Sequence, residues 1–144
     1  MAQPQFATYD PGKVSFVFGT RIITGFAQDT MITVERMNDT WIDQAGSDGF
    51  VTRARSRDKR GTVTLSLDMS SPSNDELISL FAADEMNGTG VYTLLMRDAS
   101  GTTLATSDVA WIVKPATIEY GPGVLARQWV FRCANLTMVP GGNA

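Results

Sequence analysis

The strictest pattern in the chain is a run of eight residues, 62–69, in which polar and apolar side chains alternate without a break. The apolar positions are Val63, Leu65, Leu67 and Met69, and the polar positions are Thr62, Thr64, Ser66 and Asp68. A period of two indicates a β-strand with one buried and one solvent-facing side. Such a strand is stable only beside other strands, so the pattern predicts a sheet protein.

The segment before this strand is also extended and unusually basic. As a strand, it places Val51, Arg53, Arg55 and Arg57 on one face and Phe50, Thr52, Ala54 and Ser56 on the other. The connection 56–61 is too charged for a core and too long for a two-residue turn. We therefore predict a protruding hairpin over residues 46–69 with a basic loop. Its cations are Arg53, Arg55, Arg57, Lys59 and Arg60. A protruding basic hairpin indicates contact with another molecule.

Further alternating segments predict strands over 13–18, 30–37, 91–97, 108–120 and 127–139, with turn signals between them. One helix is expected over 73–87. Ser73 and Glu76 form a capping box, Leu77 lies on an apolar stripe, and Gly88 ends the helix. The expected fold is mainly β, an antiparallel β-sandwich or barrel with one flanking α-helix. It forms a single domain, 1–144, with an N-terminal arm over 1–12 and a loose C-terminal tail over 140–144.

Composition excludes several classes of function. The chain has no histidine, which removes Ser-His-Asp and Cys-His catalysis and the commonest zinc sites. Its one cysteine, Cys133, shares an alternating apolar face with Trp129 and Phe131, which favours a buried thiol over a nucleophile. No phosphate-loop or dinucleotide motif occurs. We expect no cofactor, no metal and no enzymatic activity, although opposed carboxylates in a hydrolase stay possible.

Charge and hydropathy limit the partners. Twelve Lys and Arg against 15 Asp and Glu give a net charge of −3, which argues against general nucleic-acid binding. No apolar run approaches the roughly 20 residues of a membrane span, and the N-terminus does not resemble a signal peptide, so we expect a cytoplasmic protein. Trp41, Trp111 and Trp129 suit a sugar platform, but core or interface anchoring is the favoured interpretation.

Three stretches together resemble a known family. They are ITGFAQDTMITVERMNDTW, GSDGFVTRARSRDKRGTVTLSLDMSSPSNDEL and RQWVF, in this order. They resemble the tail tube proteins of contractile-tailed bacteriophages, over almost the whole chain. The resemblance implies the tail-tube (Hcp-like) architecture, with hexameric rings stacked into a hollow tube inside a contractile sheath. Genome DNA passes through the tube without specific binding. Further implied partners are the tape-measure protein, the baseplate hub and the tail terminator, with assembly in the bacterial cytoplasm and no membrane.

The resemblance gives two groups of residues an expected role. The polar strand faces are expected to line the lumen, through Thr33, Glu35, Thr62, Thr64, Ser66 and Asp68. Small, polar or acidic side chains there let DNA slide, because basic ones hold phosphate. The basic loop is expected to dock on acidic groups of the next ring, namely Asp75, Glu76, Asp84 or Glu85. A merely solvated loop and a DNA contact are the other interpretations of the basic residues.

Two alternatives to a phage tube stay open. One is the tube of a genome-free contractile machine of the bacteriocin or secretion type. The other is a small β-sandwich ligand-binding module, which is expected to stay monomeric and to carry a concave aromatic or polar site, whereas a tube subunit self-associates.

Overall fold

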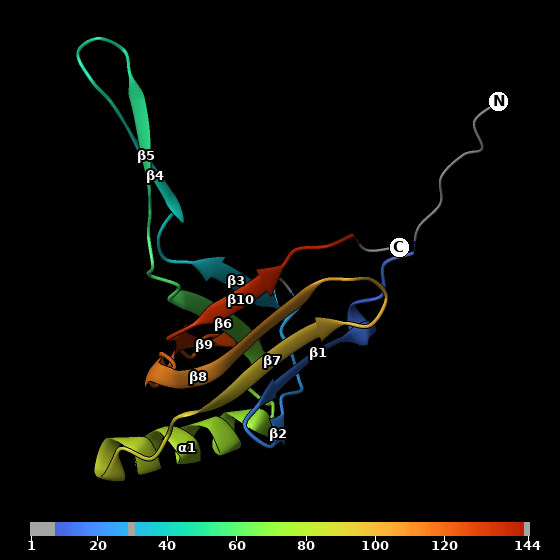
Figure 1. Ribbon diagram of the computed structural model, residues 1–144. Coiled ribbons are helices and arrows are strands. Elements are labelled where there is room, and N and C mark those ends of the chain that lie inside the picture. The colour runs from blue at the N-terminus through green and yellow to red at the C-terminus, as the bar shows by residue number, and fades with distance from the viewer. Residues whose placement is uncertain (1–7, 29–30, 143–144) are drawn as a thin grey trace, which may run out of the picture.

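The computed structural model describes residues 8–28 and 31–142 and shows a β-sandwich with one helix and one projecting hairpin (Figure 1). Residues 1–7 of the predicted arm over 1–12, and residues 143 and 144 of the predicted tail, lie outside the described residues. The elements are a 3-10 turn Pro11–Lys13, β1 Val14–Phe18, β2 Arg21–Ile22, β3 Ile32–Arg36, β4 Trp41–Ala45, β5 Val51–Arg55, β6 Gly61–Asp68, α1 Ser73–Asn87, β7 Tyr92–Asp98, β8 Leu104–Lys114, β9 Ala126–Cys133 and β10 Leu136–Val139.

Eight of the strands form one antiparallel sheet in the order β2-β1-β7-β8-β9-β6-β3, with β10 also paired to β8. Strand β8 is shared by both halves: its first part pairs with β7 and β10, and its last part pairs with β9. Register shifts on both sides of β8 mark the bend. The sheet therefore folds over itself, so that β3, β6, β9 and the end of β8 form one layer and β1, β2, β7, β10 and the start of β8 form the other.

The core lies between these layers and confirms the alternation predicted for β6. Val63, Leu65 and Leu67 are fully buried, and so is the predicted apolar thiol, Cys133. Across the core, the ring of Phe131 lies 5.5 Å from that of Phe16 and 4.9 Å from that of Phe18. The sandwich predicted from the sequence is confirmed.

The helix spans the predicted residues, Ser73–Asn87, but the hydrogen bonds at its N-terminus differ from the predicted capping box. Ser73 does not cap α1: its Oγ accepts a hydrogen bond from the Thr24 N–H at 3.0 Å, and the Ser71 Oγ accepts from the Ser73 N–H at 3.2 Å. The capping box is therefore wrong, because Ser73 ties the helix to the segment before β3. Gly88 ends α1 as predicted, with a φ of 69°.

The strand pairing predicted for the hairpin over 46–69 is wrong. Strand β5 pairs with β4, from Trp41 opposite Arg55 to Ala45 opposite Val51, whereas β6 pairs with β3 and β9. The projecting hairpin therefore spans 41–55, with its tip at 46–50, and the basic residues lie at its base (Figure 1). The turn that closes this hairpin is the Gly-Ser-Asp-Gly segment, where the Gly46 N–H donates to the Phe50 carbonyl at 2.8 Å and the Gly49 N–H donates to the Gly46 carbonyl at 2.9 Å.

Both ends of the described chain are tethered. Asp10 accepts a hydrogen bond from the Gly12 N–H at 2.9 Å and so caps the 3-10 turn. Residues 140–142, part of the predicted loose tail, are held by the β7–β8 turn, where the Thr102 N–H donates to the Gly142 carbonyl at 3.1 Å. No helix in the described part of the chain is long and apolar enough to cross a membrane.

Candidate assembly surfaces

The projecting hairpin pairs with no other strand in the part of the chain that the structure describes. All ten residues of β4 and β5 are exposed, and the hairpin forms its own two-stranded sheet. Its main internal contact is the Arg53 guanidinium, 3.8 Å above the ring of Trp41. An isolated two-stranded hairpin is marginally stable in water. The hairpin is therefore a segment that needs support from another molecule.

The tip of the hairpin is apolar rather than basic. Phe50 is 73% exposed and the adjacent Val51 63%, whereas Ile42, 61% exposed, lies nearer the base, opposite Ala54. Exposed large apolar side chains gathered on one projection indicate a contact surface. The sequence offered Trp41 as a core or interface anchor, and the structure places it exposed on β4, outside the core.

Three of the five predicted basic residues gather at the base of the hairpin. Arg55, Arg57 and Lys59 line a polar depression of about 490 Å³, together with Ser56, Ala134 and Asn135. Arg53 is engaged with Trp41, and Arg60 forms a 2.9 Å ion pair with Asp58. That hydrogen-bonded pair holds the pKa of the Asp58 carboxyl well below its usual range and raises the pKa of Arg60. Arg55 also lies 5.9 Å from the Trp41 ring. Arg60 is thus the one of the five cations whose charge an ion pair offsets among the described residues, and three of the others line the depression.

Of the four acidic residues predicted to contact the basic loop, Glu76 and Asp84 make polar contacts within the subunit, whereas Asp75 and Glu85 are exposed. Glu76 lies 3.8 Å from Arg21, and the Asp84 carboxylate accepts a hydrogen bond from the Gly90 N–H at 3.0 Å. Asp75 and Glu85 are exposed at opposite ends of α1. The last turn of α1 has no basic residue, so the negative end of the helix dipole adds to the charge of Glu85.

The basic and acidic surfaces do not meet within one subunit. Figure 1 shows the hairpin projecting from one end of the sandwich and α1 lying along the opposite end. The basic residues at the hairpin base and the acidic residues of α1 therefore lie at opposite ends of the subunit.

The polar residues predicted to line a lumen do share one face. Thr33 lies opposite Thr64, and Glu35 lies opposite Thr62, across the β3–β6 ladder. Ser66 is only 9% exposed and Asp68 is half-buried, so the face is most open toward the hairpin end.

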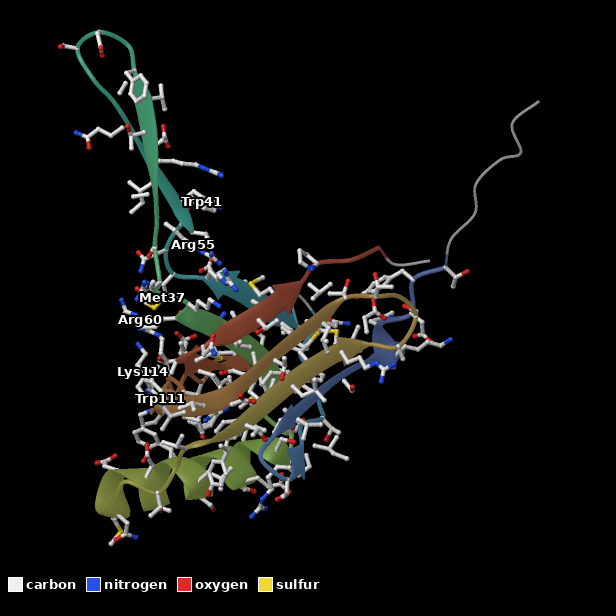
Figure 2. The ribbon with its side chains drawn as sticks, in the orientation of Figure 1. Met37, Trp41, Arg55, Arg60, Trp111 and Lys114 are labelled. Atoms are coloured by element: carbon white, nitrogen blue, oxygen red, sulfur yellow. The ribbon has the colours of Figure 1, made fainter. Side chains whose placement is uncertain are left out.

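Other strands complete this face with residues that the sequence reasoning missed. Arg132 lies opposite Thr62 on β9, and Trp111 lies opposite Arg132 on β8. Lys114 follows on the same face, opposite Val130. Figure 2 shows Trp41, Arg55, Met37, Arg60, Lys114 and Trp111 following one another along one side of the molecule. The face is thus mixed in charge rather than acidic.

An apolar cavity of about 460 Å³ lies between β1, β3, β7, β8 and β10. Its one acidic lining residue, Asp98, is held by Ser100, whose N–H and Oγ donate to its carboxylate at 2.9 and 2.6 Å. The cavity therefore does not oppose two carboxylates as a hydrolase requires. No group of three or more Cys, Asp or Glu suited to a metal ion occurs among residues 8–28 and 31–142.

The chain matches the family model of the bacteriophage PhiTE tail tube protein over residues 14–141, and it belongs to that family. It is accordingly a phage tail structural protein and not an enzyme.

Comparison with known proteins agrees on the family and the fold. "Structural protein ORF10" of Pseudomonas phage KPP10 is 32% identical over 145 residues, which cover 95% of this chain and 84% of that protein. The fold is similar to the anti-feeding prophage tube-terminating cap, with a TM-score of 0.61, 10% identity, and 96% and 95% of the two chains covered. The sheath/tube terminator of the PVC extracellular contractile injection system gives a TM-score of 0.62, 11% identity, and 92% and 96% coverage.

Proposed function

We propose that this chain builds the tail tube as hexameric rings that stack into a hollow conduit for DNA ejection inside a contractile sheath. The observation that carries the proposal is the hairpin β4–β5, which projects from a tail tube subunit and finds no support within it. A heterologous contact between unlike surfaces of identical subunits generates rings or open stacks. The hairpin end and the helix end are unlike surfaces of this kind.

Stacking joins the basic depression of one ring to the acidic helix of the next. The depression offers Arg55, Arg57 and Lys59, and α1 offers Asp75 and Glu85. These two acids lie about 15 Å apart along the helix, so one depression contacts one end. The C-terminal end is favoured because the helix dipole adds to the charge of Glu85.

Single exposed ion pairs contribute only about 0–1 kcal/mol each, but a ring repeats the contact around its circumference. We expect Arg55→Glu to shorten tubes or reduce their yield without unfolding the subunit, and Glu85→Lys to restore part of the loss. Arg97→Glu, on exposed β7, is the matched control and leaves tubes unchanged. Tube length by electron microscopy and unfolding by circular dichroism separate the two effects. Normal tubes from Arg55→Glu contradict the docking.

The lumen is lined by the polar face of β3, β6, β9 and the end of β8. Its threonines and serine offer no charge to DNA, and Arg132 and Lys114 offset Glu35 and Asp68. A face with little net charge holds phosphate weakly, which suits a conduit. A cryo-EM map of the tube tests this assignment, because Glu35 and Asp68 on the outer wall would disprove it.

The remaining partners follow from the place of a tube in a tail. The sheath protein surrounds it, the tape-measure protein fills it before DNA does, and the baseplate hub and the tail terminator close its ends. Assembly takes place in the bacterial cytoplasm, and the finished tube is part of the virion. Family membership supports these partners.

Negative-stain electron microscopy with sedimentation of the full chain at high concentration tests the function directly. Rings or hollow tubes of constant diameter are expected. A strict monomer at every concentration, also in the presence of purified baseplates as nuclei, would overturn the proposal and favour a ligand-binding module.

A tube of a genome-free contractile machine is the second candidate. It is favoured by the similarity in fold to the anti-feeding prophage cap and the PVC terminator. Nuclease-protected DNA in purified particles that carry this tube distinguishes the two, because only a phage packages a genome.

A further inference from the structure

Two short legs join the projecting hairpin to the sandwich (Figure 1). The first leg, 37–40, follows β3, and the second leg, 56–60, precedes β6. The second leg is one residue longer than the first, so the ladder of β3–β6 cannot continue in register into that of β4–β5. The direction of the hairpin is therefore not fixed by a continuous sheet.

Backbone hydrogen bonds from one leg to the other occur at the two ends of the legs and nowhere between, in the part of the chain that the structure describes. At the sandwich end, the Met37 N–H donates to the Arg60 carbonyl at 3.0 Å. At the hairpin end, the Ser56 N–H donates to the Thr40 carbonyl at 2.7 Å. The ladder is broken between these two contacts, and side chains supply the link there.

The carboxylate of Asp58 spans this break. It accepts a hydrogen bond from Nδ2 of Asn38, on the first leg, at 2.6 Å. It also accepts from Nη2 and Nε of Arg60, on the second leg, at 2.9 and 3.0 Å, and from the Arg60 N–H at 3.1 Å. Paired charge-assisted bonds of this kind hold a carboxylate and a guanidinium in one orientation. One side chain thus holds the first leg against the second.

The second leg is in turn fixed to the core. Next to Asp58, the Lys59 carbonyl accepts from the N–H of Leu136, which is fully buried. The first leg has one other side-chain link to the sandwich, through Arg36 of β3. Its guanidinium donates to the Leu136 carbonyl at 2.9 Å and reaches the Thr40 hydroxyl only at 3.4 Å. The shorter bonds of Asp58 are therefore the stronger constraint on the first leg.

We propose that Asp58 sets the direction of the hairpin β4–β5 relative to the sandwich, by joining Asn38 to Arg60 across the break in the ladder. Asp58 is then a positioning residue for assembly and not itself a contact between subunits. Exposed ion pairs add little to stability, so loss of Asp58 should change where the hairpin points rather than whether the sandwich folds. The part of this inference that concerns assembly rests on the proposed function.

The distance between two spin labels tests the direction in the dilute, full-length subunit. Thr52→Cys on β5 and Thr137→Cys on β10 place the labels at exposed positions, whereas the native Cys133 is buried. Pulsed electron paramagnetic resonance should give one narrow distance distribution, which Asp58→Ala should broaden or shift. Asp39→Ala is the matched control and should leave it unchanged. It removes an exposed carboxylate from the same break that makes no hydrogen bond or ion pair with the described residues.

Exchange of the two side chains tests the link across the break. Asn38→Asp alone places a second carboxylate against that of Asp58 and should broaden the distance distribution. Asn38→Asp combined with Asp58→Asn again provides one donor and one acceptor across the break, and should narrow the distribution. Loss of stability alone would not be reversed by this exchange, and circular dichroism shows that each variant is folded.

The outcomes separate this inference from the proposed function. Asp58→Ala should remove tubes from the sedimenting fraction, whereas Asp39→Ala should keep the wild-type yield. An unchanged distance distribution in Asp58→Ala would overturn the role of Asp58 in setting the direction. A broadened distribution with normal tubes would overturn its role in assembly, because the neighbouring subunit would then orient the hairpin. A wild-type chain that never forms rings or tubes would overturn the proposed function and leave the result of the distance measurement in place.

Discussion

The sandwich and the hairpin β4–β5 are built from the same alternating strands, yet they differ in what holds them. In the sandwich, residues such as Phe16, Leu65 and Phe131 are fully buried between two layers. In the hairpin, every strand residue is exposed and one cation–aromatic stack is the main side-chain contact. The sandwich is stabilised by burial within the subunit, whereas the hairpin buries none of its strand residues in the described part of the chain. Folding and assembly are thus assigned to different residues, which mutations can separate.

Phe131→Ala should have the largest effect on the subunit. It removes a fully buried ring that contacts both Phe16 and Phe18, and such truncations cost about 3–5 kcal/mol of unfolding free energy. Urea unfolding followed by circular dichroism measures the loss. Phe50→Ala at the exposed hairpin tip is the matched control and should change stability by less than about 0.5 kcal/mol. If Phe131→Ala and Phe50→Ala lowered the unfolding free energy equally, folding and assembly would not depend on different residues.

Gly61→Ala should follow, at the point where the chain returns from the hairpin to the sandwich. A Cβ at this buried position would collide with the side chain of Leu136, and overpacking of this kind costs about 1–3 kcal/mol. Gly123→Ala, with open space around it, is the control. If thermal unfolding showed the same midpoint for both variants, the close contact between β6 and β10 would be wrong.

Ser73→Ala should have a smaller effect that tests the corrected start of the helix. The substitution removes the oxygen that accepts from the Thr24 N–H in a part-buried hydrogen bond, and a hydrogen bond of this kind contributes about 0.5–1.5 kcal/mol. Ser79→Ala removes only an exposed hydroxyl that donates to the Asp75 carbonyl, so this control should change the unfolding free energy very little. A capping role for Ser73 would instead reduce helix content, which far-ultraviolet circular dichroism detects.

The difference between the two regions also explains how far the sequence could be interpreted. Alternation reports burial, and burial is strong in the sandwich, so β6, its face and the position of Cys133 were predicted correctly. Alternation does not report which strand is the partner. The sequence therefore predicted that the basic segment 50–57 pairs with the following strand, β6. In the structure it pairs with the preceding strand, β4, across the turn at 46–49.

The cations of the polar face escaped prediction for a related reason. Arg132 and Lys114 come from strands that are distant from β6 in the sequence and reach its face only through the sheet order. Contacts between subunits depend in addition on how two copies meet, which local patterns do not encode. Docking of the hairpin base on α1 of another copy stays a prediction, and the sequence did not reveal that Arg60 pairs with Asp58 or that Asp84 accepts from the Gly90 N–H.

Removal of the hairpin should have the smallest effect on the subunit and the clearest one on assembly. The Ser56 N–H donates to the Thr40 carbonyl at 2.7 Å, so an Asn-Gly turn can join these residues in place of 41–55. The unfolding free energy should change by less than about 0.5 kcal/mol, because no core residue is lost, while tubes should disappear from electron micrographs. A loss of several kcal/mol would make the hairpin part of the fold. Normal tubes would leave its exposed apolar tip without a function in assembly, and the contact between rings would then have to come from the sandwich itself.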